Sequence, residues 1–184
     1  MRASMKNPLI LAALLAGMPP AFAQSNATVV AIGASNTSGF GVGEAAAYPA
    51  RLEGILRACG YAVRVVNAGI SFETTNGMLA RIDRDVPNGT RVVVIQPGGN
   101  DRRFFVSRKQ RAANIEGMKA RLVERGIVAI VYDPVFPPEA YQWDGIHLTA
   151  ARHLVVAQEL APAVAVHLVK PSRDDRRGAA CPVG

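Results

Sequence analysis

The sequence predicts an α/β fold: a three-layer α/β/α sandwich around a small parallel sheet of about four strands. One observation behind this prediction is the segment 27–33, a run of mostly β-branched and other apolar residues that ends at a glycine. Such a continuous run is typical of a parallel strand buried on both faces. The other observation is that similar runs alternate with amphipathic segments along the chain, which is the pattern of a parallel sheet covered by helices.

Residues 1–23 have the features of a secretory signal peptide and are left out of the fold. Arg2 and Lys6 provide a positively charged start, residues 9–16 form a short apolar core, and Ala21-Phe22-Ala23 is a small-x-small cleavage site. We expect cleavage after Ala23 and a periplasmic or secreted protein. Because the apolar run is too short to cross a bilayer, we expect no stable membrane insertion.

The remaining strands are expected at 62–67, 91–96 and 127–132, each preceded by a turn that contains glycine. Four helices are expected. The first begins near Tyr48-Pro49, the second is a short helix with Met78 and Ile82 inward, and the other two cover 107–124 and 149–168. Segments 36–43 and 97–101 are rich in glycine and are expected to be loops.

One domain, residues 24–170, accounts for this pattern, and residues 171–184 are expected to form a flexible tail. Cys59 is expected on the buried face of a helix, and Cys181 lies in the tail. In an exported protein the two can form a disulfide, but their spacing does not decide whether they pair. The sequence also leaves the oligomeric state open.

The composition argues against two classes of function. The formal net charge is +7, but the arginines are scattered and no aromatic residues interleave with them in a recognised nucleic-acid-binding motif. No nucleic-acid partner is therefore expected. Because the spacing of His, Cys, Asp and Glu matches no metal-binding pattern, no metal site is expected either.

Polar residues with chemical potential follow the expected strands. Ser35 comes directly after the first strand, and Asn100 follows Gly98-Gly99 after the third. Because a parallel sheet brings the carboxyl ends of its strands to one edge, these residues are expected to meet there. Ser35 is a candidate nucleophile, and the Asn100 amide is a candidate donor to an oxyanion. Each can equally belong to an ordinary turn.

Asp144 and His147 lie three residues apart, just before the last expected helix. This spacing lets the carboxylate orient the imidazole and stabilise its charged form, so that His147 can act as a base toward a serine hydroxyl. The alternative is that Asp144 only caps a turn and that His147 is a surface residue. Segment 35–39 also resembles the phosphate loop of flavodoxins, and the glycines at 39–43 resemble a dinucleotide-binding loop, but neither alternative explains Asp144 and His147.

Together the three motifs Gly33-Ala34-Ser35, Gly98-Gly99-Asn100-Asp101 and Asp144-Gly145-Ile146-His147-Leu148 resemble the first, third and fifth blocks of the SGNH hydrolases, also called GDSL esterases. The similarity is greatest to the periplasmic thioesterase and arylesterase branch. The resemblance implies the flavodoxin-like SGNH fold, a small-molecule ester or thioester substrate with short acyl or aryl groups, and no cofactor.

The resemblance also implies site residues. Ser35, Asp144 and His147 would be the catalytic triad, and Ser35, Phe72 and Asn100 would form the oxyanion hole. Substrate contacts are expected from Gly69, Phe72, Gly99 and Trp143.

Three features depart from the family pattern. Ala34 replaces the usual aspartate of the first block. Phe72 stands where the second block has its oxyanion glycine, although phenylalanine keeps the backbone N–H that this role requires. The segment 101–143 is also short, which predicts a trimmed sheet of about four strands and an open site. A noncatalytic protein and a carbohydrate deacetylase on the same scaffold remain alternatives.

Overall fold

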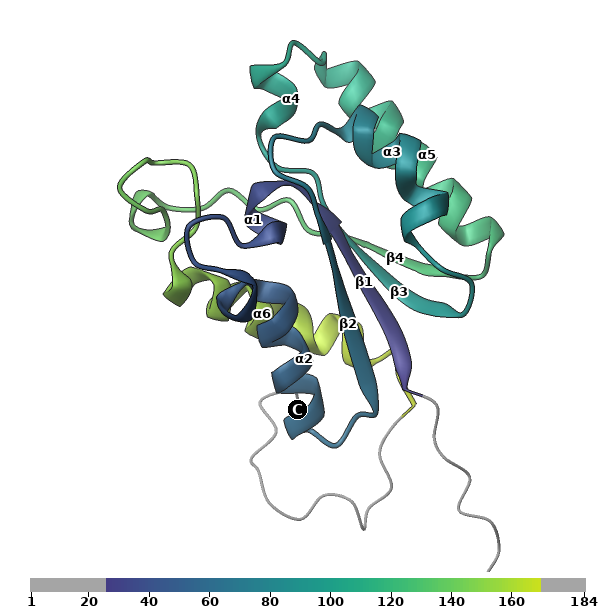
Figure 1. Ribbon diagram of the computed structural model, residues 1–184. Helices are drawn as coiled ribbons and strands as arrows, with labels where there is room; N and C mark the ends of the chain where they lie inside the picture. The colour runs from purple at the N-terminus through teal and green to yellow at the C-terminus, as the bar shows by residue number, and fades with distance from the viewer. Residues whose placement is uncertain (1–25, 170–184) are drawn as a thin grey trace, which may run out of the picture.

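The computed structural model describes residues 26–169 and confirms the three-layer α/β/α architecture (Figure 1). Its elements are β1 (Ala27–Gly33), α1 (Ser35–Ser38), η1 (Glu44–Ala46), α2 (Tyr48–Ala58), β2 (Val63–Gly69), α3 (Thr75–Asp85), β3 (Thr90–Gln96), α4 (Asn100–Arg103), α5 (Arg108–Glu124), β4 (Val128–Val131), η2 (Pro138–Ala140) and α6 (Ala150–Ala165). The expected signal peptide at 1–23 and the expected tail at 171–184 lie outside the described residues.

The sheet of this region has four parallel strands in the order β2-β1-β3-β4, as the short length of the segment before Asp144 predicted. Along β1, successive side chains alternate between two separate apolar clusters: Val29 and Ala31 belong to one, and Val30 and Ile32 to the other. All four are fully buried. The continuous apolar run arises because each face of the strand packs under helices.

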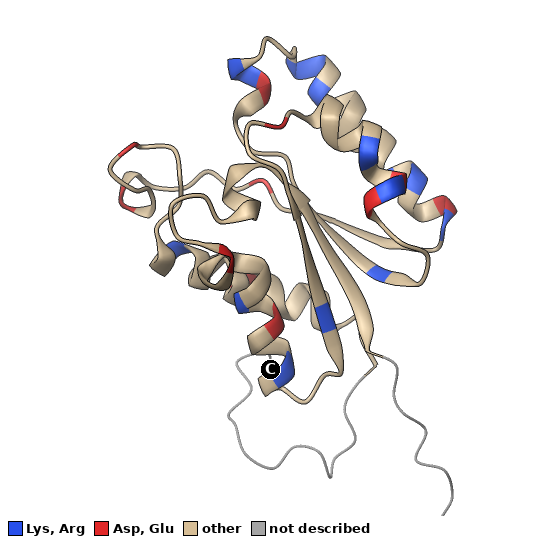
Figure 2. Ribbon diagram, viewed as in Figure 1, with Lys and Arg blue, Asp and Glu red and all other residues tan. Residues whose placement is uncertain are grey.

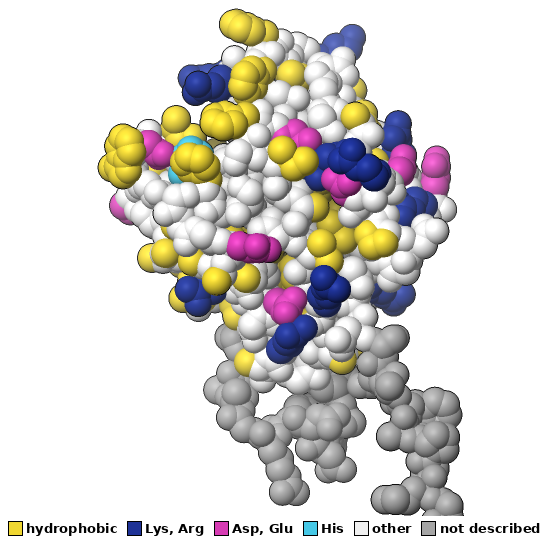
Figure 3. Space-filling view, in the orientation of Figure 1, with side chains coloured by type: hydrophobic (Ala, Val, Ile, Leu, Met, Phe, Trp, Pro, Cys, Tyr) yellow, Lys and Arg dark blue, Asp and Glu magenta, His cyan; other side chains and the backbone are white. Residues whose placement is uncertain are grey.

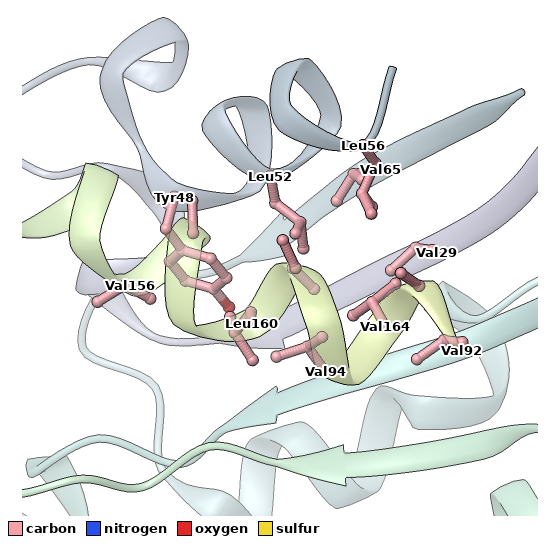
Figure 4. Close-up of a cluster of buried hydrophobic side chains, with 14 of the residues drawn as sticks. Val29, Tyr48, Leu52, Leu56, Val65, Val92, Val94, Val156, Leu160 and Val164 are labelled. Atoms are coloured by element: carbon pink, nitrogen blue, oxygen red, sulfur yellow. The ribbon is translucent and has the colours of Figure 1, made fainter. Parts of the chain in front are cut away.

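Helices α2 and α6 cover one face of the sheet, and α3 and α5 cover the other. Figure 4 shows the first of these cores, where Leu52 from α2 and Leu160 from α6 lie over the strand residues Val29 and Val94. Burying a leucine of this kind contributes about 1.5–3 kcal/mol relative to exposure.

The topology determines where a ligand can bind. β1 lies between β2 and β3, and the chain leaves β1 toward α2 on one face but leaves β3 toward α5 on the opposite face. The two connections therefore diverge beyond the carboxyl ends of β1 and β3. In a sheet of this order a crevice opens at that switch point.

Two segments expected to be loops contain single-turn helices, α1 in the segment 36–43 and α4 next to Gly98-Gly99. One turn is too short to produce a helical pattern of apolar residues. Both turns begin with a residue of the candidate site, Ser35 or Asn100, and are held by contacts with distant parts of the chain.

Cys59 directly follows α2 and is buried, as expected. Cys181, with which the sequence leaves a disulfide open, lies outside the described residues.

His153 on α6 is a fully buried histidine. Its Nδ1 accepts a hydrogen bond from the Tyr48 backbone N–H at 3.2 Å, which requires that this nitrogen carry no proton. Nε2 is buried without a hydrogen-bond partner among the described residues. Burial lowers the pKa of His153 to about 4, because the charged ring would lose its hydration.

We expect the protein to lose stability as the pH falls from about 6.5, the pKa of an unfolded histidine, toward 4. In this window the unfolded chain binds a proton at His153 that the folded chain does not, so the unfolding constant rises by up to about tenfold per pH unit. Urea denaturation of wild type and His153→Asn across this range measures the effect. The Asn variant should reduce the slope, and equal slopes in the two proteins would contradict the assignment.

Candidate active site

Ser35 is the first residue of α1 and follows β1 after only Ala34. This sharp turn depends on Gly33, because a Cβ there would lie 2.1 Å from Thr37 Oγ1 and 2.8 Å from the Gln96 carbonyl oxygen. Thr37 Oγ1 in turn donates to Gln96 Oε1 at 2.8 Å, which fixes α1 to the end of β3. Ser35 Oγ makes no hydrogen bond with His147 or with any other part of residues 26–169.

Gly69 lies at the end of β2 and supports the same turn. A Cβ on Gly69 would lie 2.2 Å from the Ser38 backbone nitrogen, so only glycine lets β2 approach α1 this closely. Contact of Gly69 with substrate stays a prediction from the sequence. Within the described residues it is not among those that line the cavity beside Ser35, and its position indicates a role in holding α1.

Asp144 and His147 are in direct contact. Asp144 Oδ2 lies 2.6 Å from His147 Nδ1, and Asp144 Oδ1 accepts from the backbone N–H groups of Ile146 and His147 at 2.9 and 3.0 Å. These three interactions, with the His147 backbone N–H contributing most, lower the pKa of Asp144 to about 2. The carboxylate is therefore ionised at neutral pH and fixes the orientation of the imidazole. The Phe40 ring stacks on the His147 ring with centroids 4.3 Å apart.

Asn36 connects the turn that carries Ser35 to the loop that carries Asp144 and His147. Its Oδ1 accepts from the Leu148 backbone N–H at 2.9 Å, and its Nδ2 donates to the Ile146 carbonyl at 3.5 Å. Asn36 therefore binds the residue on each side of His147, while it is itself the neighbour of Ser35. Sequence reasoning missed this residue, because no local pattern indicates a partner more than a hundred positions away.

We expect Asn36→Ala to lower kcat for ester hydrolysis by about tenfold, since a lost hydrogen bond of about 1 kcal/mol loosens the loop that holds His147. KM should change less than kcat. The measurement is steady-state kinetics together with the rate at which a fluorophosphonate labels the protein. Asn88→Ala removes an amide from a remote turn and is the matched control. A tenfold loss in the control, or none in Asn36→Ala, would contradict this role.

Asn100 begins α4 and lies beside the loop after β2. Its Nδ2 donates to the Glu73 carbonyl at 2.9 Å, which leaves the second hydrogen of the amide free for a ligand. Gly98 precedes it with a φ of 66°, a conformation that favours glycine. Gly99 and Asn100 both line the cavity next to Ser35.

A buried polar network holds the Asn100 loop. Asp101 is 3% exposed and accepts hydrogen bonds from the Thr75 backbone N–H at 2.8 Å, from Thr75 Oγ1 at 2.9 Å and from Arg111 at 3.0 Å. Arg111 also donates to the Gly98 carbonyl and to Asp133. The network connects the loops after β2, β3 and β4. No sequence pattern indicates this network, because Arg111 resembles any exposed arginine on a charged helix.

Phe72 has the backbone conformation expected for a glycine position. Its φ is 65°, and the turn around it is closed by a hydrogen bond from the Glu73 N–H to the Ile70 carbonyl at 3.3 Å. The Phe72 N–H has no partner within the described residues, and its ring is 58% exposed. Neither Phe72 nor Trp143, which is 97% exposed, is among the described residues that line the cavity.

The cavity beside Ser35 has a volume of about 850 Å³ and lies at the crevice beyond β1 and β3. One wall is aromatic and comes from Tyr132, Phe136 and Tyr141. Arg102 and Arg103 from α4 line another side. No group of three or more His, Cys, Asp or Glu side chains within residues 26–169 could hold a metal ion.

This fold, with a serine at the switch point and an aspartate–histidine pair on a neighbouring loop, defines the class of SGNH-type serine hydrolases, which act on ester bonds. The chain belongs to the GDSL-like Lipase/Acylhydrolase family, whose sequence profile matches residues 31–178. No curated protein that was compared with the sequence matches it.

Solved structures with the same fold include several esterases. TesA is 23% identical with a TM-score of 0.70, and the match covers 77% of this chain and 99% of TesA. AlinE4, described as an SGNH-hydrolase family esterase, is 25% identical with a TM-score of 0.56 over 78% of this chain and 74% of AlinE4. The esterase EstA from Pseudoalteromonas sp. is 16% identical with a TM-score of 0.64, and the match covers 77% of this chain and 98% of EstA.

Proposed function

We propose that this protein is an exported esterase that hydrolyses short acyl or aryl carboxylic esters, or thioesters, through a Ser35-His147-Asp144 triad and an acyl-enzyme. The observation that carries the proposal is the contact of the ionised Asp144 with His147 Nδ1, on a loop that is hydrogen-bonded through the Leu148 N–H to Asn36, the residue beside Ser35. An imidazole held in this way has its Nε2 free to accept a proton.

In the first half of the reaction, Ser35 Oγ attacks the ester carbonyl carbon while His147 Nε2 takes the hydroxyl proton. The carbonyl π electrons move onto oxygen, and the resulting oxyanion accepts hydrogen bonds from the Ser35 and Phe72 N–H groups and the free Asn100 amide hydrogen. When the intermediate collapses, the bond to the leaving alcohol or thiol breaks. His147 returns its proton to that group, and the acyl chain stays on Ser35.

The second half repeats these steps with water. The water oxygen attacks the acyl carbon while His147 takes a proton from the water, and the same donors stabilise the oxyanion. The bond between the acyl carbon and Ser35 Oγ then breaks, and Ser35 Oγ receives the proton from His147. The carboxylic acid is released and the free enzyme is restored. Asp144 stays ionised throughout, and it stabilises the imidazolium that forms twice in each cycle.

The lining of the cavity favours substrates of limited size. Tyr132, Phe136 and Tyr141 present flat apolar surfaces suited to an aryl group or a short acyl chain. The departure at Phe72 affects this pocket little, because its ring lies among the exposed side chains and only its N–H is needed.

The proposal is tested by the purified protein with p-nitrophenyl acetate, butyrate and octanoate and an acyl thioester, followed by mass spectrometry after fluorophosphonate treatment. We expect turnover that is highest for the shorter chains and a single adduct on the peptide that contains Ser35. No turnover of any substrate together with no adduct would favour a noncatalytic protein. Turnover of acetylated sugars alone would favour a deacetylase.

Export is a separate part of the proposal and rests on the pattern of residues 1–23. Fractionation of a Gram-negative host that expresses the full chain, followed by N-terminal sequencing, should give a periplasmic protein that begins at Gln24. A cytoplasmic protein that retains Met1 would contradict it.

A further inference from the structure

The exposed large apolar side chains are concentrated around the candidate active site. Phe72, Phe104, Phe105, Val135, Trp143 and Ile146 all belong to loops at the carboxyl ends of the strands, and we call them the apolar rim. Three of them are almost completely exposed: Phe105 at 96%, Trp143 at 97% and Val135 at 98%. Apolar side chains clustered in this way mark an interaction surface rather than the scattered exposure of an ordinary protein.

The apolar rim flanks the cavity on two sides. Val135 and Ile146 line the cavity directly, and Phe104 and Phe105 follow Arg103, which lines it on the α4 side. Figure 3 shows apolar side chains gathered over the end of the molecule formed by α4 and by the loop before α6, with basic side chains beside them. A surface that contacts this rim would also face the entrance to the cavity.

The charges on the α4 side of the apolar rim are mostly basic, whereas the ionised Asp144 lies between Trp143 and Ile146 on the other side. Segment 102–109 contains Arg102, Arg103, Arg108 and Lys109 and no acidic residue, and all four cations are exposed. Figure 2 shows these basic positions on α4 and the start of α5. The neighbouring acids Asp101 and Asp133 share one partner, Arg111, so this cluster offsets only one of the four positive charges and the α4 side stays basic.

Aromatic rings beside arginine and lysine suit the boundary of an anionic bilayer, where rings enter the headgroup layer and cations approach lipid phosphates. A second copy of the chain fits less well. A two-fold contact through this rim would bring the segments 102–109 of both copies together and oppose like charges. No helix in residues 26–169 is long and apolar enough to cross a membrane, so the contact would be peripheral.

We propose that the apolar rim docks the protein on an anionic phospholipid surface, with Phe104, Phe105 and Trp143 entering the headgroup layer and segment 102–109 contacting phosphates. The entrance to the cavity then opens toward the lipid surface. This inference concerns binding and does not depend on which ester the protein hydrolyses.

Trp143 is the only tryptophan of the chain, so its fluorescence reports directly on the rim. The full-length protein is titrated with vesicles of phosphatidylcholine alone and of phosphatidylcholine mixed with phosphatidylglycerol. With the anionic vesicles we expect a blue shift of the Trp143 emission and quenching by brominated acyl chains. High salt should reverse both effects, because it screens the basic segment.

Variants separate the parts of the proposal. Phe105→Ser should weaken partitioning by about tenfold, and Arg102→Gln and Arg103→Gln by about fivefold each. Val123→Ser, which removes a 67% exposed side chain from the distant end of α5, is the matched control and should bind as wild type does. All four positions are exposed, so the variants should fold, and circular dichroism checks this.

Several results would overturn the inference: no blue shift with anionic vesicles, equal binding of zwitterionic vesicles, or cosedimentation that leaves Trp143 emission unchanged. A concentration-dependent dimer that Phe105→Ser abolishes would assign the rim to a second copy instead. The titration is repeated with Ser35→Ala, which should bind vesicles as wild type does. Vesicle binding without ester hydrolysis would mean that the proposed function fails and the docking proposal holds. Ester hydrolysis without vesicle binding would mean the reverse.

Discussion

Replacing Ser35 with alanine is expected to lower kcat for a short p-nitrophenyl ester by at least about a thousandfold. The substitution removes the only atom that can form the acyl-enzyme, whereas the oxyanion donors and the cavity stay in place. KM should therefore change little. Reaction with a fluorophosphonate should disappear completely, since the label requires the same oxygen. Steady-state kinetics and intact-protein mass spectrometry measure these two effects.

Ser38→Ala is the matched control, because it removes a hydroxyl from the same helical turn. Ser38 Oγ donates to the Ser35 carbonyl at 3.0 Å and lies 3.3 Å from Ser71 Oγ, so its loss should relax α1 but spare the chemistry. A reduction of less than about tenfold is expected. If Ser35→Ala kept wild-type turnover, another residue would have to be the nucleophile, and the proposed function would fail with it.

The sequence sufficed to predict the sheet because its central strands β1 and β3 have a nearly continuous apolar pattern. In β1 and β3 alternate residues pack into opposite cores, so both faces require apolar side chains. Such a strand can be recognised from the sequence alone. The convergence of Ser35 and Asn100 followed from the parallel arrangement alone, since successive loops must then leave the same edge.

The residues that hold the candidate site were not predictable in the same way. Asn36, Asp101 and Arg111 act through hydrogen bonds to partners that are remote in sequence, and their types are common on any surface. Arg81 is the extreme case. An arginine on a helix is usually solvated, but Arg81 is 5% exposed and pairs with Glu73 and Asp85 while donating to the Ala68 carbonyl.

Phe72 shows what a sequence motif can and cannot specify. The family pattern has glycine at the place of Phe72, and the left-handed φ of 65° is the physical reason that glycine is favoured there. Phenylalanine adopts the same φ at a cost of about 1–2 kcal/mol. The sequence could locate this departure but could not tell that the ring would lie outside the cavity wall.

The second large effect is expected for Asp144→Asn, which should lower kcat by about a thousand- to ten-thousandfold. The asparagine Oδ1 can still accept from the Ile146 and His147 N–H groups, so the loop keeps its shape. Its Nδ2, however, would replace the oxygen that faces His147 Nδ1. Because Nδ2 is a donor, His147 would have to accept at Nδ1 and carry its proton on Nε2.

His147 in that tautomer cannot take the proton from Ser35, and no ionised carboxylate remains to stabilise the imidazolium. The loss should therefore appear in kcat and in the rate of fluorophosphonate labelling, while the melting temperature changes by only a few degrees. Asp83→Asn, on the outer side of α3 with Arg121 and Arg125, is the matched control and should retain activity. If Asp144→Asn kept wild-type kcat, Asp144 would only be the cap of a turn, and His147 would need another partner to act as a base.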